Sequence, residues 1–458
     1  MDRIETLVSW AVEHGARLHP AVEIYQDADT GLSFRVKPSA SSPIGPYETI
    51  VSLPGSLALS YLDAEAALPA ALLSVGVAAL PPHVLGRLVL VAEFLRGRGS
   101  RWWPYIQALP QPSQPSAWRL PPFWPAEDAE LLDGTNVEVG LKRIRAEVDA
   151  ELAEARRLLA QHAPDADLAR DLSPALYRWA YCIFSSRSFR PSLVLSEAQL
   201  ARRLPDGVAP DDFSVLLPLF DVGNHSMATP VRWAVQGDVE GKAVALQVGR
   251  EHRPGEQVFN NYSMKSNAEL LLGYGFMVPA TEQLHADYVH VRKRGAANPA
   301  DEYLISLRPM GHASSALGRS KQPAAFSALL GADMLSAFQH VQPDMVWDIF
   351  CALAPTDEQR AHLLSGCGDD DAARLRSFFA GRVGEECRMY LEQTAAIIQH
   401  KILQELERLD ESDFEVDGAG ELERNQRLAL EYRAACRRVL ESTLEAMNAD
   451  EVLGQEEE

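Results

Sequence analysis

Cysteine is scarce in this sequence, and the few cysteines form no pattern. A disulfide framework uses cysteines in pairs, and a structural zinc site uses closely spaced pairs such as C-x-x-C. Neither pattern occurs, so the sequence predicts no disulfide framework and no metal site. The five cysteines are Cys182, Cys351, Cys367, Cys387 and Cys436.

Long hydrophobic runs are absent as well. A transmembrane helix needs about 18 consecutive apolar residues, and no stretch of the sequence approaches that length. Residues 1–12 carry acidic side chains in an amphipathic pattern, unlike the basic start and apolar run of a secretory signal. We therefore expect no membrane partner, and a location in the cytoplasm, the nucleus or both.

Positive charge is outweighed by negative charge. The sequence has 43 Lys and Arg against 64 Asp and Glu, which gives a formal net charge of −21. Repulsion over the whole surface disfavours binding to a phosphate backbone, so we expect no nucleic-acid partner. The same charge would suit a basic protein partner through long-range steering, although charge also serves solubility alone. We expect the protein to be a monomer.

Several common catalytic motifs are also missing. The sequence has no H-E-x-x-H, no Walker loop, no G-x-G-x-x-G after a strand and no G-x-S-x-G elbow. Its 12 histidines are dispersed. Metalloprotease, nucleotide-hydrolysing, dinucleotide-binding and serine-hydrolase chemistry therefore have no support.

What the sequence does contain is two strand-forming regions separated by a helical one. Residues 30–36 and 48–53 predict two short strands, and apolar residues alternate again in 231–235 and 244–248. From about residue 60 the period becomes helical, and a long amphipathic helix is predicted from apolar residues three and four apart. These residues are Leu141, Ile144, Val148, Leu152, Ala155 and Leu159.

Local signals then predict a turn, a capped helix and a helical C-terminal part. Residues 253–256 (Arg-Pro-Gly-Glu) fit a type II turn. Ser266 and Glu269 fit a capping box. After about residue 295 the pattern is helical, with two apolar stripes between residues 391 and 447.

Three motifs follow one another closely in the second strand-forming region. They are residues 221–226 (Asp-Val-Gly-Asn-His-Ser), 255–262 (Gly-Glu-Gln-Val-Phe-Asn-Asn-Tyr) and 265–276 (Lys-Ser-Asn-Ala-Glu-Leu-Leu-Leu-Gly-Tyr-Gly-Phe). An Asn-His pair alone is common in turns and helix caps. Together, the three motifs resemble the cofactor and lysine-channel motifs of SET-domain protein methyltransferases, of the Rubisco large-subunit lysine methyltransferase class.

The resemblance extends over the helical region. Residues 100–110 resemble the S-x-W-x-P-Y-L-x-x-L-P segment of that class, and residues 179–189 resemble its W-A-x-x-x-x-x-S-R-x-F helix. The implied fold is α+β, a split SET β-fold with a helical insertion and an all-α C-terminal substrate-binding domain. The implied domains are residues 1–60 and 186–290 for the two parts of the SET domain, 61–185 for the insertion and 295–458 for the C-terminal domain.

Tyr262 is the catalytic residue that the resemblance implies. In that class the tyrosine at this position directs its hydroxyl at the transferred methyl group and at the target nitrogen. The residue lies just beyond a predicted strand and before a capped helix, where rigid elements can aim its side chain. By residue type alone, a buried structural tyrosine with a satisfied hydroxyl is the commoner use.

The resemblance implies S-adenosylmethionine as the cofactor. It places the asparagine of the Asn-His pair at the amino-acid end of the cofactor, the histidine main chain at the adenine, and an arginine at the carboxylate. The sequence departs from the class at Ser33, where a second glycine is usual. A plain turn and a surface salt bridge are the structural alternatives for the loop and the arginine. The implied cofactor-binding residues are Thr30, Gly31, Leu32, Arg187, Asn224 and His225.

The implied substrate-binding residues line a channel for the target amine. Asp221 matches a position whose main-chain carbonyl faces the amine, and Arg187 flanks the substrate. Tyr262, Tyr274 and Trp233 would form aromatic walls able to hold an ammonium-like group. A packed-core role fits Trp233 equally well.

The sequence thus predicts a protein-lysine N-methyltransferase that uses S-adenosylmethionine and acts on a non-histone protein, with a ribosomal or translation-related protein as one option. Two alternatives remain open at this point. The first is a protein-histidine N-methyltransferase of the same class, and the second is a non-catalytic SET-fold module that binds proteins.

Overall fold

The computed structural model describes residues 2–204, 207–237, 241–293, 301–329, 333–413 and 422–450. The chain forms two compact units, each built from two stretches of sequence. The first unit comprises residues 1–123 and 143–263, and the second comprises residues 124–142 and 264–458.

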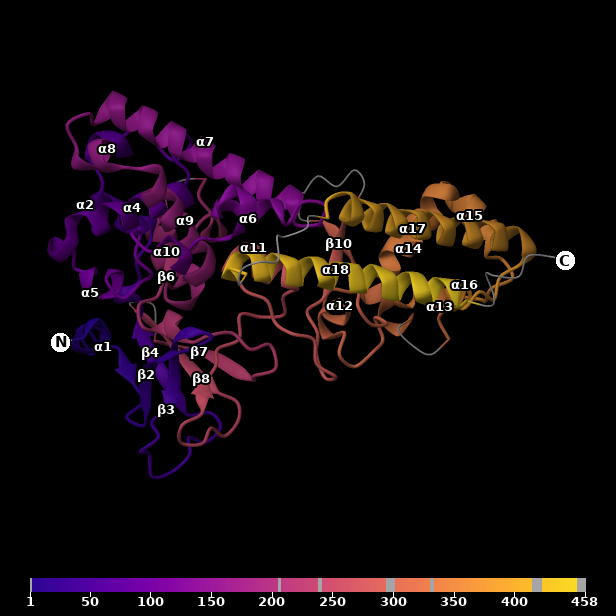
Figure 1. Ribbon diagram of the computed structural model, residues 1–458, viewed down its shortest axis with the longest axis horizontal. Coiled ribbons are helices and arrows are strands. Elements are labelled where there is room, and N and C mark those ends of the chain that lie inside the picture. The colour runs from indigo at the N-terminus through magenta and orange to yellow at the C-terminus, as the bar shows by residue number, and fades with distance from the viewer. Residues whose placement is uncertain are drawn as a thin grey trace. The chain divides into compact units, whose positions relative to one another are not determined.

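The first unit contains the β-structure that the sequence predicts (Figure 1). One antiparallel sheet has the strand order β1-β4-β8-β7, and a second has the order β2-β3-β9. A bulge between Thr49 and Val51 shifts the β4–β8 register. The strands are β1 (Arg17–Leu18), β2 (Val22–Asp27), β3 (Gly31–Val36), β4 (Thr49–Pro54), β7 (Val231–Gly237), β8 (Lys242–Val248) and β9 (Gln257–Val258).

Helices of the first unit pack on these strands and on a short pair, β5 (Ser188–Phe189) with β6 (Val215–Leu216). Most of α7 (Glu138–His162), which follows the predicted stripe, also belongs to this unit. The others are α1 (Arg3–Glu13), α2 (Ala64–Ala67), α3 (Ala70–Leu73), α4 (Pro82–Arg96), α5 (Trp103–Ile106), α8 (Asp167–Asp171), α9 (Pro174–Arg187) and α10 (Glu197–Arg203).

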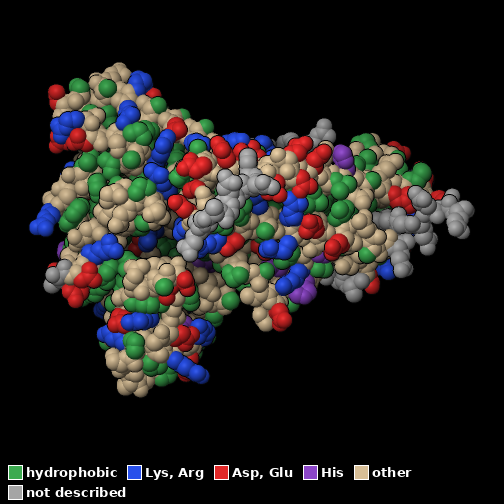
Figure 2. Space-filling model, in the orientation of Figure 1, with side chains coloured by type: hydrophobic (Ala, Val, Ile, Leu, Met, Phe, Trp, Pro, Cys, Tyr) green, Lys and Arg blue, Asp and Glu red, His purple; other side chains and the backbone are tan. Residues whose placement is uncertain are grey.

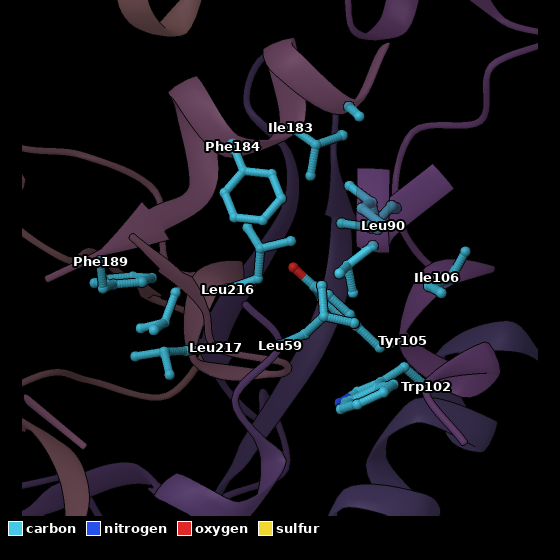
Figure 3. Close-up of a cluster of buried hydrophobic side chains, with 14 of the residues drawn as sticks. Leu59, Leu90, Trp102, Tyr105, Ile106, Ile183, Phe184, Phe189, Leu216 and Leu217 are labelled. Carbon is cyan, nitrogen blue, oxygen red and sulfur yellow. The ribbon is translucent and has the colours of Figure 1, made fainter. Parts of the chain in front are cut away.

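The strands and the helices of the first unit share one hydrophobic core. Figure 3 shows part of it, where Leu216 lies near Phe184 of α9 and Leu217 lies near Phe189. The helices between residues 61 and 123 therefore bury their apolar faces against the strands, because short helices cannot bury those faces alone.

The compact units divide the chain at points other than the predicted domain limits. The predicted insertion, residues 61–185, falls mainly in the first unit together with the strands, and residues 124–142 fall in the second unit. The predicted start of the C-terminal domain at residue 295 lies outside the described residues. The domain limits therefore stay a prediction.

The second unit is mainly helical, as predicted. Helices α17 and α18 carry the two predicted apolar stripes and run side by side (Figure 1). Ser266 and Glu269 form the predicted capping box of α11. The helices are α6 (Ala126–Glu130), α11 (Asn267–Tyr274), α12 (Ala316–Ser320), α13 (Ser336–Gln339), α14 (Pro343–Leu353), α15 (Asp357–Leu363), α16 (Asp371–Phe379), α17 (Glu385–Glu411) and α18 (Arg424–Asn448).

One strand pair in the second unit was not predicted. Strand β10 (Tyr288–Arg292) pairs in antiparallel fashion with β11 (Glu302–Ser306). The C-terminal part is therefore helical with a two-stranded addition. The apolar run at residues 303–305 is too short for periodicity to separate strand from helix.

The described residues contain five free cysteines, of which only Cys351 is not buried. Among these residues no group of three or more His, Cys, Asp or Glu side chains is arranged to hold a metal ion. No helix in the described ranges is long and apolar enough to cross a membrane. On the face shown in Figure 2, the described acidic and basic side chains are interspersed rather than gathered by sign.

Gly55 provides a test of the first unit's packing. A Cβ at this residue would lie 2.4 Å from the main-chain oxygen of Val194 and 3.2 Å from that of Lys242. Neither oxygen belongs to a flexible side chain, so Gly55→Ala should lower the free energy of unfolding by roughly 2 kcal/mol in chemical denaturation.

Gly99→Ala is the matched control, because a Cβ there meets nothing within 4 Å. It should leave stability unchanged or raise it by about 0.5 kcal/mol. Equal stabilities of the two variants would contradict the close packing at Gly55.

Candidate active site

Two segments that the sequence singled out run side by side in the first unit. The main-chain N–H of Asn260 donates to the oxygen of Asn224 at 2.7 Å, and the N–H of Ser226 donates to the oxygen of Asn260 at 2.9 Å. His225 and Asn260 thereby form a parallel bridge. The Asn-His motif and the segment leading to Tyr262 are thus joined through their main chains.

Close packing at Gly223 brings a third segment to the same place. A short 3-10 turn, η8 (Phe220–Val222), precedes this glycine. A Cβ at residue 223 would lie 3.1 Å from the Cβ of Asn260 and 3.5 Å from the ring of Phe34 in β3. The absence of a side chain therefore lets β3 and the two joined segments approach one another.

Tyr262 is held at three points. Its main-chain N–H donates to Nδ1 of His225 at 3.0 Å, and its ring stacks on the imidazole with centroids 4.9 Å apart. Its hydroxyl donates to the main-chain oxygen of Gly223 at 2.9 Å. Because an N–H donates to Nδ1, that nitrogen carries no proton in this arrangement. The half-buried phenol therefore has a fixed direction.

Asp221 and Arg187 form a second part of the site. Nη1 of Arg187 lies 3.3 Å from both the carboxylate and the main-chain oxygen of Asp221. The Tyr105 hydroxyl donates to the same carboxylate at 2.9 Å, and Figure 3 shows Tyr105 among the buried side chains of the first unit. The Asp221 side chain is 2% exposed and that of Arg187 is 26% exposed. A nearly buried carboxylate thus has one cation and one hydroxyl as partners.

Burial dominates the titration of this group. It raises the pKa of Asp221 above its ordinary value, although Arg187 and the Tyr105 hydroxyl act in the opposite direction. Burial also raises the pKa of Tyr105 well above its ordinary value, and the neighbouring Asp221 adds to this. Tyr105 therefore stays a hydrogen-bond donor throughout the neutral range.

The amide of Asn224 faces β3. Its Nδ2 donates to the main-chain oxygen of Leu32 at 3.2 Å and also to the Ser33 hydroxyl. Gly31 begins β3 with a φ of +76°, which glycine adopts without strain. Thr30 is exposed in the turn before it. The loop that was predicted to contact the cofactor therefore lies against the Asn-His motif.

Trp233 forms an aromatic cluster beside this motif. Its Nε1 donates to Oδ1 of the fully buried Asn260 at 2.8 Å. Its ring lies 5.5 Å from that of Phe189 and 6.3 Å from that of Phe220, measured between centroids. The half-buried indole is therefore fixed by one hydrogen bond and two edge-to-face contacts.

Tyr274 belongs to the second unit, at the end of α11. Its ring lies 6.2 Å from Phe276, and Nζ of Lys265 lies 5.6 Å from the ring centroid. Burial raises the pKa of Tyr274 above its ordinary value. Its role in a channel wall stays a prediction.

The first unit thus contains every predicted site residue except Tyr274. Three further residues were not assigned a role from the sequence: Tyr105, Ser33 and Asn260. Tyr105 lies in the motif at residues 100–110, which was a usable signal. Asn260 lies within the motif at residues 255–262, but nothing in the sequence indicates that Trp233 is its partner.

Comparisons with known proteins give sequence relatives and a solved fold. No family model matches the sequence. The ribosomal lysine N-methyltransferase set10 of Schizosaccharomyces pombe is 29% identical over 283 residues, which cover 60% of this chain and 46% of that protein. The actin-histidine N-methyltransferase of Drosophila melanogaster is 27% identical over 307 residues, which cover 64% and 51%. The chain spans about half the length of these two curated relatives.

A crystal structure of the SET domain of LSMT bound to MeLysine and AdoHcy matches the fold with a TM-score of 0.51 at 20% identity. The match covers 92% of this chain and 97% of that chain. The fold is therefore that of a SET domain with a helical C-terminal region. The sequence relatives are protein methyltransferases, and the fold is that of an LSMT SET domain, in agreement with the resemblance that the motifs predicted.

The Asp221–Arg187 pair generates a stability prediction. Arg187→Met leaves a buried carboxylate without its cation, which should cost about 3 kcal/mol of unfolding free energy near neutral pH. Arg187 lowers the pKa of Asp221, so its loss raises that pKa further. A carboxyl with a raised folded pKa is tolerated when protonated at low pH, and it destabilises the fold as the pH rises through that pKa.

The loss of unfolding free energy in Arg187→Met should therefore become smaller as the pH falls. Denaturant titrations at several pH values measure this loss. Arg170→Met is the control, because Arg170 is 66% exposed in its pair with Asp167, and its change should stay within about 0.5 kcal/mol. A deficit of Arg187→Met that does not depend on pH would argue against this coupling.

Proposed function

We propose that the protein is an S-adenosylmethionine-dependent protein-lysine N-methyltransferase acting on a non-histone protein. The observation that carries this proposal is the fixation of Tyr262 against His225 and Gly223, within a SET fold. A phenol with a fixed direction beside the Asn-His motif is what orientation of a methyl group and an amine requires.

The residues present fit the proposed cofactor. Both N–H groups of the Asn224 amide are directed at Leu32 and Ser33, which leaves Oδ1 as an acceptor for the ammonium group of an amino acid. Arg187 uses Nη1 for Asp221 and retains further N–H donors for a carboxylate. The main chain of Gly31 and Leu32 would lie along the methionine part. When bound, S-adenosylmethionine supplies a methyl group on a sulfonium.

The chain's own contribution is orientation and polarity. The Tyr262 hydroxyl donates a hydrogen bond to the Gly223 oxygen, and a phenolic oxygen is also an acceptor for polarised C–H or N–H groups. The Trp233 ring adds an apolar and π-rich wall. We assign no general base, since desolvation in an apolar slot lowers the pKa of a lysine amine.

The substrate is proposed from charge and from the relatives. A formal net charge of −21 favours a basic protein partner through steering. The relative named as a ribosomal lysine N-methyltransferase makes a ribosomal or translation-related protein the leading option. The second unit would contribute to its recognition, and such a substrate places the reaction in the cytoplasm, the nucleus or both.

A second candidate is methyl transfer to histidine, which the similarity to an actin-histidine N-methyltransferase supports. The third, a non-catalytic binding module, has no observation in its favour, because Tyr262, Asn224 and His225 are all in place.

Tyr262→Phe tests the catalytic proposal. Removing the hydroxyl should lower the single-turnover rate of methyl transfer by about 100-fold, the loss typical of one oriented polar group, while calorimetry shows unchanged cofactor binding. Tyr47→Phe is the control, because Tyr47 is 73% exposed, and its rate should equal that of the wild type. A wild-type rate for Tyr262→Phe would remove Tyr262 from the mechanism.

The acceptor can be identified directly. The protein is incubated with methyl-labelled cofactor and an extract of cells that lack it, and the labelled protein is hydrolysed to amino acids. Label in methyl-lysine is expected. Label in methylhistidine would replace the lysine proposal by the histidine one, and calorimetry without heat of cofactor binding would favour the binding module.

A further inference from the structure

A series of hydrogen bonds runs from the carboxylate of Asp27 to the side-chain amide of Asn224. The Thr30 hydroxyl donates to Oδ1 of Asp27 at 2.9 Å. The Ser33 hydroxyl lies 3.0 Å from the Thr30 hydroxyl, and Nδ2 of Asn224 donates to the Ser33 hydroxyl. Four side chains from two distant segments are therefore connected.

The carboxylate sets the direction of the series. An ionised carboxylate only accepts, so the single hydroxyl proton of Thr30 is used toward Asp27. The proton of Ser33 must then point to Thr30 or to the oxygen of Gly31, which is 3.2 Å away. Hydrogen bonds from the main chain and hydroxyl of Thr30 lower the pKa of Asp27 to about 2. The direction is therefore kept across the neutral range.

The Ser33 oxygen is consequently an acceptor. It accepts from Asn224 and, at 3.0 Å, from Nε2 of Gln257. The Ser33 side chain is fully buried, so water cannot replace these partners. Since the Leu32 oxygen also accepts from Asn224, a flip of the amide would place its oxygen against another oxygen. The orientation of the Asn224 amide is thereby fixed.

We propose that Ser33 is a positioning residue that turns the Asn224 carbonyl oxygen toward the ligand, where it accepts from the ammonium group of the cofactor's amino-acid end. This inference rests on the proposed function. It assigns a role to the one residue of the loop that departs from the class, because the glycine usual at this position has no hydroxyl to orient an amide.

The test compares two ligands that cannot react, S-adenosylhomocysteine and its analogue with hydrogen in place of the α-amino group. Calorimetry on the full chain gives the Kd of each. The wild type should bind the deaminated analogue at least about tenfold more weakly, the value of one hydrogen bond to a charged group. Ser33→Ala should raise the Kd of S-adenosylhomocysteine about fivefold and that of the analogue less than about twofold.

Two further variants separate positioning from folding. Thr30→Val removes the next hydroxyl of the series at an exposed residue, and it should change the two Kd values in the same selective way, by about twofold to threefold for S-adenosylhomocysteine. Ser52→Ala, in strand β4, is the matched control and should change neither Kd. The midpoint of thermal unfolding is measured for every variant.

Selectively weaker binding of S-adenosylhomocysteine by Ser33→Ala supports the inference. If Ser33→Ala does not fold, the same comparison is made with Thr30→Val. Equal weakening of both ligands would show a structural role only and overturn it. Equal binding of both ligands by the wild type would also overturn it and leave the proposed function standing. A wild type that binds neither ligand contradicts the proposed function, and this inference with it.

Discussion

The hydrogen bonds between the main chain of Asn224–Ser226 and that of Asn260 hold the candidate site together. They bring a motif that follows a 3-10 turn beside a segment that follows a strand, more than thirty positions later in the chain. Tyr262 comes two residues after this junction, so its hydroxyl reaches Gly223 without crossing a loop. The direction of the phenol is therefore a consequence of main-chain pairing.

Side-chain hydrogen bonds then connect further residues to these paired main-chain segments. The Trp233 indole is tied to the junction through Asn260, and the Asn224 amide is tied to β3 through Leu32 and Ser33. Oδ1 of Asn260, Nδ2 of Asn224 and the Ser33 hydroxyl each have a partner of the opposite kind, which avoids the cost of an unsatisfied polar group. In the proposed function, Oδ1 of Asn224 is the acceptor for the ligand.

The nearly buried Asp221 carboxylate shows what such a site costs. Burial raises its pKa, and the fold compensates with Arg187 and Tyr105. Tyr105 comes from the helical region between the two strand regions, so the helices do more than fill space. They supply the partner of a charged group at the site, and this links the stability of the first unit to the arrangement of the candidate active site.

Much of this was readable in the sequence, because it depends on local patterns and short motifs. Strand patterns predicted β3, β4, β7 and β8 but not β2, and the pair Ser266 and Glu269 predicted the start of α11. The motifs predicted the fold class, and nine of the ten site residues that they imply lie in the first unit. The short run at residues 303–305 was missed as a strand, since strand pairing is decided by a partner that the local pattern does not contain.

Only the tertiary structure decided which side chains meet. Nothing in the sequence indicates that Asn260 accepts from Trp233, that Tyr105 donates to Asp221, or that Ser33 accepts from Asn224. The residues of each pair lie tens to nearly two hundred positions apart, and residue type alone does not determine such contacts. The sequence by itself determined the elements and the class of chemistry, because periodicity and motif spacing act locally. The direction of each polar group was decided by the folding of distant segments onto one another.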